Sequence, residues 1–518
     1  MVCDSFAFLG YTKRWYIVMS CVAGAMCSFG IAILPAKESS ANTAGALIFL
    51  TSYFKANVDI LSEGFYSRLI IKQPDQGPAL VSWVWWFVLV GNIISSMVLG
   101  PLGDNHIPQV GVYISMVLQL LTIVVFIYNW YGEKPNREER ADDVKYRCLK
   151  QLTERNMNEI ATTNHREFQI SDNDTDGALQ KPLMDDKGEE LKRNLLSDPI
   201  PCCFGLFEMN KDIIVFNWRA LTYAVILTIA VVVMIICNIF SGKIGLLIAC
   251  SSVSIVCCGA SFWALPLAIA KVNVFGYLQS ISFILLPGAI NTFYMTDAKC
   301  LPNGPHFSYT FYNGFLAVFS NVGALLGVLC FSHFFPKVNY RLAFILPTIG
   351  IMFASLIDIT IVKRWNIKIG IPDHFLYLFS HSVVVQILIK LQGMPMFVLL
   401  SRLCPCGSEC LVYALLSGFT SLGRSGSTTL GAIIMEFFLP IKTKVPCDYS
   451  NMPLLILICH GIAPSITIPF IFLLIPSARI CDNLDINGHV VKDKVNSEVI
   501  MRREPLMEDK DKQTTKDS

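Results

Sequence analysis

Residues 218–240 read WRALTYAVILTIAVVVMIICNIF, an apolar run with Arg219 as its only charged residue. About 20 apolar residues are enough to cross about 30 Å of hydrocarbon as an α-helix, and a helix satisfies its backbone hydrogen bonds internally, as a bilayer requires. Similar runs recur along the chain. We predict about twelve membrane spans, near residues 15–34, 44–66, 79–100, 108–129, 218–240, 244–269, 274–296, 310–334, 341–362, 373–400, 409–435 and 452–476.

The composition of the whole chain agrees with this prediction. Of 518 residues, 53% are hydrophobic and 15% are charged, and the mean hydropathy is +0.52, which is too apolar for a soluble globular protein. The net charge of +2 is nearly neutral, and no basic stripe interleaved with aromatic residues appears, so nucleic-acid binding is excluded. The expected fold class is an all-α polytopic membrane protein, with the lipid bilayer as its main environment.

Two long segments are polar and charged instead. Residues 131–217 and 477–518 contain runs of Lys, Asp and Glu, and such segments cannot bury enough apolar surface to fold. We predict that both are disordered and cytoplasmic.

The orientation follows from lysine and arginine residues near the span ends. The short loops alone are nearly balanced, because Lys13, Arg14 and Arg68 on one side are matched by basic residues such as Lys363 and Lys442 on the other. The basic residues of the segment 131–217 decide the orientation, and we place that side in the cytoplasm. An even number of spans puts both termini there, and we expect the plasma membrane. The one glycosylation sequon, at Asn173, would then remain unmodified.

Half of the 18 cysteines fall within predicted spans, where cysteine packs as a small apolar residue. Cys404, Cys406 and Cys410 are close in sequence but lack the second pair or histidine of a zinc site, so we predict neither a metal nor a cofactor. Cys300 and Cys447 fall in outer loops and could pair. The sequence gives no distance between them, so unpaired thiols are the expectation.

Ionisable residues at membrane depth are costly and need an explanation. Lys55, Asp59 and Glu63 are spaced four apart and share one helix face, where they could neutralise one another or line a cavity. Arg424 lies near the centre of its span among small residues and needs an anionic partner, which could be Asp59, Glu436 or a substrate.

The pair Gly323 and Gly327 forms a G-x-x-x-G pattern in another span. This pattern predicts close helix packing rather than a binding site.

One loop pattern occurs twice, as is common in transporters built from repeated helix bundles. Residues 4–17 (DSFAFLGYTKRWYI) precede one span and residues 332–344 (SHFFPKVNYRLAF) precede another. In both, aromatic residues are followed by a lysine and an arginine before the helix begins.

Seven short blocks extend over nearly the whole chain: GYTKRWY (10–16), YFKANVD (53–59), GPALVSW (77–83), GPHF (304–307), GIPDH (370–374), MPM (394–396) and SRLCPCGSE (401–409). In this order they resemble the folate-biopterin transporters, a branch of the major facilitator superfamily, and particularly the protozoan pteridine transporters among them.

The resemblance implies major-facilitator-like helical bundles and transport of folate, biopterin or related pteridines by alternating access. In that family the block resembling residues 4–16 lies between the second and third helices, which implies that the chain lacks the first two. The implied organisation is a partial N-terminal bundle (1–130), the loop (131–217), an inserted helix pair (218–273), a six-helix C-terminal bundle (274–476) and the tail (477–518).

The resemblance also suggests substrate-binding residues. The donors on the edge of a pterin could be accepted by Asp59 or Glu63, and Lys55 or Arg424 could hold the carboxylates of folate. Buried carboxylates could also exchange protons, so symport with protons is one energy source. No P-loop motif is present, which disfavours ATP-driven transport.

The first loop looks like the gating loop of the superfamily, in which charge pairs hold one conformation of two rocking bundles. The residues that would form this gate are Asp4, Lys13, Arg14, Lys337, Arg341, Arg402 and Glu409. Anchoring at the cytoplasmic surface explains Lys13 and Arg14 equally well, and Glu409 could instead favour a helix N-terminus.

Two alternatives to a transporter stay open. One is a non-transporting relative, acting as a sensor or an inactive remnant. The other is an intramembrane enzyme, which would need a nucleophile and base or a metal site at membrane depth. The histidines considered for such a site lie mostly near span ends without partners, namely His106, His306, His374 and His460, and we expect no enzymatic activity.

Overall fold

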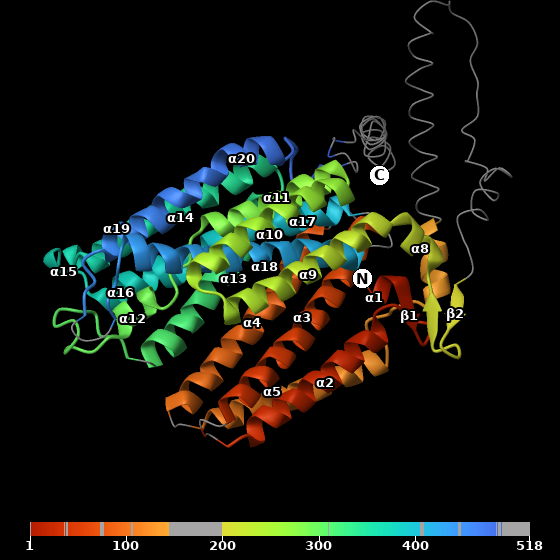
Figure 1. Cartoon of the computed structure of the whole chain (residues 1–518), viewed down its shortest axis with the longest axis horizontal. Coiled ribbons are helices and arrows are strands. Elements are labelled where there is room, and N and C mark those ends of the chain that lie inside the picture. Colours follow the sequence, from red (N-terminus) through yellow and green to blue (C-terminus); the bar gives the residue numbers. More distant parts are fainter. Residues whose placement is uncertain are drawn as a thin grey trace, which may run out of the picture.

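Helices account for nearly all of the described structure (Figure 1). The computed structural model describes residues 2–35, 37, 40–72, 77–104, 107–144, 199–308, 310–404, 409–443 and 447–482, together with residues 484, 488 and 490. The sequon at Asn173 and most of the two polar segments lie outside these ranges.

The N-terminal part consists of long helices that lie together on one side of the molecule (Figure 1). They are α2 (Arg14–Ile33), α3 (Ala41–Lys72), α4 (Gly77–Asp104) and α5 (Pro108–Ile127). α2 packs against both α3 and α5. α5 begins with Pro108, because the fixed φ of proline suits the first helical turn and its missing N–H is not needed there.

The rest of the chain forms a second group of helices. Its long members are α9 (Trp218–Phe240), α10 (Lys243–Ala264), α11 (Leu267–Ser282), α13 (Leu316–Phe334), α14 (Tyr340–Val362), α17 (Val385–Leu403) and α18 (Glu409–Ile433). Shorter pieces complete it: α8 (Lys211–Phe216), α12 (Ala289–Met295), α15 (Trp365–Lys368), α16 (Asp373–Tyr377), α19 (Met452–Ile456), α20 (Thr467–Leu474) and the 3₁₀ turn η8 (Ala463–Ile466).

Several of these helices contain π-helical turns. The turns are η4 (Thr310–Phe315), η5 (Leu378–Val384), η6 (Ile434–Phe438) and η7 (Leu457–Ile462). Such turns leave one extra residue in the helical ladder and are frequent at functional sites.

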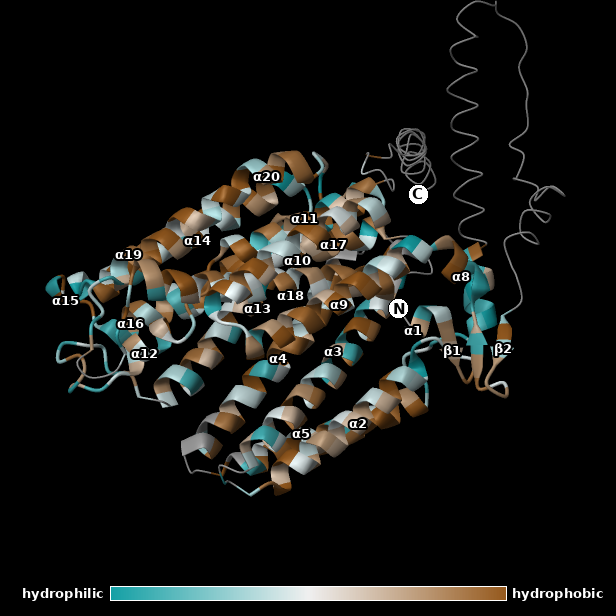
Figure 2. Ribbon diagram, viewed as in Figure 1, coloured by the Kyte–Doolittle hydropathy of each residue, from teal (hydrophilic) through white to brown (hydrophobic). Residues whose placement is uncertain are grey.

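The surface of the helices is apolar, as expected for a chain that faces lipid. Phe87 is 70% exposed and Ile255 is 74% exposed, and hydrophobic residues run along the helices in Figure 2. Among the described residues, nine helices are long and apolar enough to cross a membrane. The chain is therefore a polytopic membrane protein.

Helices α3, α11 and α18 are outside this set of nine, although each coincides with a predicted span, so twelve spans stay a prediction. The span predicted at 274–296 is wrong in its bounds, because α11 starts directly after Pro266 and ends at Ser282. Pro287 and Gly288, with φ of 77° at Gly288, separate α11 from α12, since proline and left-handed glycine interrupt helices.

A small sheet departs from the all-α expectation. Strand β1 (Phe6–Phe8) pairs antiparallel with β3 (Phe207–Met209), which pairs with β2 (Ile200–Cys202). Residues 136–144 are helical. The predicted disorder of residues 131–217 is therefore wrong at both ends of that segment, because each end packs against the N-terminus.

The two groups of helices meet along a defined set of contacts. α4 packs against α13, α3 packs against α18, and α17 contacts both α3 and α4. α9 and α10 pack against α18, and α10 also packs against α11. In Figure 1 the sheet and α8 lie at one end of the molecule, and α12, α15 and α16 lie at the opposite end.

Candidate functional site

α3 carries the charged residues that the sequence places on one helix face. Lys55 and Asp59 are exposed and Glu63 is half-buried. Lys55 and Asp59 interact electrostatically, but within the described part of the chain they form no ion pair. Charged side chains in a membrane span need a partner, water or a solute, so mutual neutralisation and lining of a cavity both stay open for these residues.

α18 presents Arg424 with its side chain exposed. The neighbouring Gly423 permits close packing of α18 on α11, since a Cβ there would lie 2.8 Å from the carbonyl oxygen of Tyr277. Glu436, one proposed partner of Arg424, instead forms an ion pair with Lys243. In the residues that the structure covers, no ion pair joins Arg424 to Asp59.

Lys390 on α17 is a further cation that the sequence analysis missed. Its Nζ lies 3.7 Å from the ring centre of Trp85 on α4, so a cation–π contact joins the two groups of helices. A signal was present in the sequence, because Lys390 is the one lysine or arginine within the apolar span 373–400.

These charged residues lie on helices that belong to the boundary between the two groups. α3 and α4 of the N-terminal part contact α13, α17 and α18 of the rest of the chain. Lys55, Asp59 and Glu63 lie on a helix of the N-terminal side of this junction, and Lys390 and Arg424 lie on helices of the other side. The helices that carry them supply carboxylate, cationic and aromatic groups to one region.

Asp4 joins the two groups at the end that carries the sheet. It is 6% exposed, and its Oδ2 accepts a hydrogen bond of 3.0 Å from the backbone N–H of Leu411, near the start of α18. A carboxylate at a helix N-terminus satisfies a free N–H and interacts favourably with the helix dipole. Asp4 thus caps the helix that carries Arg424.

Glu133 organises the start of α2 next to this contact. It accepts hydrogen bonds of 2.8 Å from the backbone N–H groups of both Lys13 and Arg14, and Thr12 donates to it at 3.0 Å. Tyr131 also donates to Glu133. Burial and the nearby Glu133 carboxylate raise the pKa of Tyr131 above its ordinary value, so its hydroxyl stays protonated and remains a donor.

An ion-pair network completes this end of the molecule. Arg68 on α3 pairs with Glu139 and, at 3.3 Å, with Asp143, and Arg140 pairs with Asp212. Four of these residues, Arg68, Glu139, Arg140 and Asp143, line a small cavity together with Asp4, Thr12, Asn136, Asn210 and Ile213. Residues 136–144 are thereby fixed to α3 and to the segment leading into α9.

Two of the other predicted gate residues contact the end of the C-terminal part. Arg341 donates from Nε to the carbonyl oxygen of Ile475 at 3.0 Å, and Arg402 donates to the carbonyl oxygen of Cys481 at 3.1 Å. Both hold the segment that follows α20. Lys337 is exposed, and the side chain of Glu409 lies outside the described structure.

Cys410, near the start of α18, has neighbours from the N-terminus of the chain that its place in the sequence did not indicate. Cys410 lies beside Cys3 and Asp4, with the sulfur and carboxylate oxygen atoms all within 4.8 Å of one another. Cys406, the third member of the cluster considered in the sequence, is outside the described residues. Because Asp4 already accepts the N–H of Leu411, this grouping belongs to the contact between Asp4 and α18.

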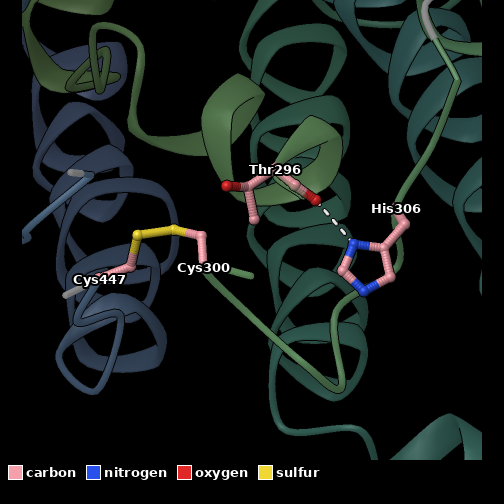
Figure 3. Close-up of a disulfide and its surroundings, with 4 residues drawn as sticks. All are labelled: Thr296, Cys300, His306 and Cys447. Atoms are coloured by element: carbon pink, nitrogen blue, oxygen red, sulfur yellow. Dashed lines mark hydrogen bonds between the residues drawn. A yellow bond between two sulfur atoms is a disulfide. The ribbon is translucent and has the colours of Figure 1, made fainter. Parts of the chain in front are cut away.

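Cys300 and Cys447 form a disulfide at the opposite end, with their Cα atoms 5.3 Å apart (Figure 3). The expectation of free thiols was wrong, because 147 residues separate the two in sequence and only the fold brings them together. In the same loop, Nδ1 of His306 lies 2.7 Å from the carbonyl oxygen of Thr296.

A model of the BT1 family matches residues 1–495. Among curated proteins, probable folate-biopterin transporter 6 of Arabidopsis thaliana is 29% identical over 181 residues, which are 35% of this chain and 34% of that protein. Folate transporter 1 of Plasmodium falciparum is 28% identical over 28% of each chain. The folate-biopterin transporter of Synechocystis is 26% identical over 31% of each. The chain thus matches about a third of the length of these relatives.

Among solved structures, an auto-inhibited peptide transporter of the POT family is similar with a TM-score of 0.49. The sequence identity is 13%, over 92% of this chain and 85% of that one.

Proposed function

This chain belongs to the BT1 family, and from that membership we propose that it carries folate, biopterin or a related pteridine across a membrane by alternating access. The family is one of transporters, so the chain is not an enzyme. Relatives from a plant, a protozoan and a cyanobacterium are named for folate or biopterin transport, which supports this substrate class.

The proposed binding site is the junction between the two groups of helices. Asp59 or Glu63 on α3 accepts the donors on the pterin edge, and Trp85 stacks on the ring. Lys55, Lys390 or Arg424 holds the carboxylates of a folate tail. The observation that carries this assignment is the distribution of these groups over helices that meet between the two parts of the chain.

The proposed gate is the contact of Asp4 with α18. It closes the end of the junction that bears the sheet, and Lys13 and Arg14 support it through Glu133. Alternating access then requires this contact to open when the two bundles rock. The major-facilitator-like arrangement with twelve spans is part of the same proposal, with α9 and α10 as a pair that packs against the C-terminal bundle.

We assign the gate end and both termini to the cytoplasm, with the protein in the plasma membrane. The disulfide between Cys300 and Cys447 supports this orientation, because disulfides persist on the oxidising side of a membrane and this one lies at the end opposite the gate.

The test is uptake of radiolabelled folate and biopterin by cells that express the 518-residue chain. For folate, Asp59→Asn, Lys390→Gln and Arg424→Gln should each lower uptake about 10-fold, since each removes a charge that pairs with the substrate. For biopterin, which has no tail carboxylates, the large effect is expected from Asp59→Asn alone. The matched controls are Asp297→Asn and Lys299→Gln in an exposed loop, which should leave uptake unchanged.

Two results would contradict the proposal. Unchanged uptake in all three junction variants would contradict the proposed binding site. Absence of uptake by the unaltered chain would reject the proposed substrate class. Binding of folate without uptake would favour the non-transporting relative instead.

A further inference from the structure

A buried aspartate and a histidine lie together inside the C-terminal part, apart from the junction described above. Asp358 is one turn before the end of α14 and is 8% exposed. His381 belongs to the π-helical turn η5, and its Nδ1 lies 3.5 Å from Oδ2 of Asp358. Neither residue was singled out from the sequence.

The surroundings of the pair are aromatic and contain few charges. The ring of His381 stacks on that of Tyr377, with ring centres 4.9 Å apart. The titratable groups that interact electrostatically with Asp358 from the neighbouring elements are Tyr294, Tyr312, Tyr377 and His460. Within the described residues, no lysine or arginine forms an ion pair with Asp358, so its basic partner is His381.

Polar groups extend from the pair towards the outer end of the molecule. The hydroxyl of Tyr377 lies 3.5 Å from that of Tyr312, and Tyr312 donates a hydrogen bond of 2.8 Å to Oδ1 of Asn291 on α12. His460, on the other side, is held by the carbonyl oxygen of Ile284 at 3.1 Å from its Nε2. This arrangement leaves His381 as the histidine in direct contact with the carboxylate.

The charge of the pair depends on one proton. A carboxylate beside a neutral imidazole carries a net charge of −1 in a region of low dielectric, which is costly. When the pair binds one proton it becomes a neutral imidazolium–carboxylate pair. Oδ1 of Asp358 has no hydrogen-bond partner in the described structure, so the carboxylate is poorly compensated without that proton.

We propose that Asp358 and His381 form a proton-binding site that couples solute transport by this chain to a proton gradient. The inference rests on the proposed function and adds the coupling ion to it. One proton enters from the outer side and binds to the pair, whose net charge changes from −1 to zero. The same proton leaves to the cytoplasm after the conformational change, which returns the pair to −1, and no other bond is made or broken.

The packing of η5 supplies a connection from the pair to the junction. η5 lies against α13, where a Cβ at Gly323 would lie 2.7 Å from the carbonyl oxygen of Val383. α13 in turn is the helix that packs against α4 of the N-terminal part. A change in the charge of His381 therefore acts on a helical turn that packs against α13, the helix that contacts the N-terminal part.

The experiment uses the full chain in proteoliposomes and measures two quantities. The first is counterflow of labelled folate or biopterin at equal pH on both sides, which needs transport but no driving force. The second is accumulation driven by an inward proton gradient. The variants are Asp358→Asn and His381→Gln, and the matched controls are the exposed residues His333→Gln and Asp297→Asn.

We expect both site variants to keep counterflow within about 2-fold of the unaltered chain and to lose gradient-driven accumulation about 10-fold, because only the coupling step needs the titrating pair. The controls should match the unaltered chain in both assays. The exchanged double variant, Asp358→His with His381→Asp, should regain part of the accumulation, which a merely structural role would not predict.

The outcomes separate the two proposals. Counterflow by the unaltered chain without accumulation in a proton gradient keeps the transporter and overturns the coupling. Accumulation by both site variants, or accumulation driven by a sodium gradient at constant pH, also overturns it, as does an equal loss of both activities in the site variants. Absence of counterflow in the unaltered chain rejects the proposed substrates and the coupling together.

Discussion

At the scale of single residues, Asp4 makes the contact whose removal is easiest to interpret. Asp4→Ala deletes the acceptor for the N–H of Leu411, and a lost helix cap costs about 1 kcal/mol. We expect the ratio of closed to open gate to fall about 5-fold. The measurement is the alkylation rate of Cys410, which is 1% exposed beside Asp4, followed by mass spectrometry of the labelled peptides.

An internal control distinguishes gate opening from general unfolding. Cys257 on α10 is 0% exposed and lies outside the gate, so its alkylation rate should not change. Asp4→Asn keeps an oxygen acceptor and should have a smaller effect. An equal rise in the alkylation rates of Cys257 and Cys410 would mean that the variant destabilises the whole fold.

Single residues also show how much of the candidate site could be predicted from the sequence. Lys55, Asp59 and Glu63 were found from their spacing, because helical periodicity is a local property. The partner of Asp4 could not be found in this way, since Leu411 is 407 residues away. Asp358 and His381 were missed for the same reason, because neither is unusual until the fold brings α14 and η5 together.

At the scale of helices, the G-x-x-x-G pair on α13 tests how closely the helices pack. The prediction of tight packing is confirmed, since a Cβ at Gly327 would lie 2.8 Å from the carbonyl oxygen of Ile387 on α17. Gly327→Ala therefore forces two backbones apart, at a cost of about 1–3 kcal/mol. We expect a lower thermal unfolding midpoint for the purified protein.

The matched control is Gly91→Ala on α4, where an added Cβ meets no atom within 4 Å. It should leave the midpoint unchanged or raise it, because alanine favours helix more than glycine. Equal midpoints for the Gly327 and Gly91 variants would show that α13 and α17 are less closely packed than the structure indicates.

Helix positions were largely predictable, and their ends were less so. Long apolar runs specify spans whatever their neighbours are, so α9, α13 and α14 lie close to the predicted ranges. The break between α11 and α12 was missed although Pro287 and Gly288 mark it. The ordered ends of residues 131–217 were missed because strand β3 forms by pairing with β1, about 200 residues away in sequence, and with β2, and such a short strand is not stable alone.

At the scale of the whole molecule, the disulfide and the free cysteines test the proposed orientation. In intact cells, an impermeant reductant followed by an impermeant maleimide should label Cys300 and Cys447. Cys203 and Cys481 are exposed free thiols near the gate end, and they should be labelled only after the membrane is permeabilised. Labelling of Cys203 and Cys481 in intact cells would reverse the orientation.

The contact between Asp4 and Leu411 also constrains the order of events during synthesis. At about 5–20 residues per second, Leu411 is made about 20–80 s after Asp4, so α2 to α5 enter the bilayer long before their partner helix exists. The N-terminal strand meets an earlier delay, since β3 follows it by about 200 residues. A nascent chain halted before α18 therefore presents Asp4 without its N–H partner beside open helix faces, and closure of this contact requires that translation has passed the start of α18.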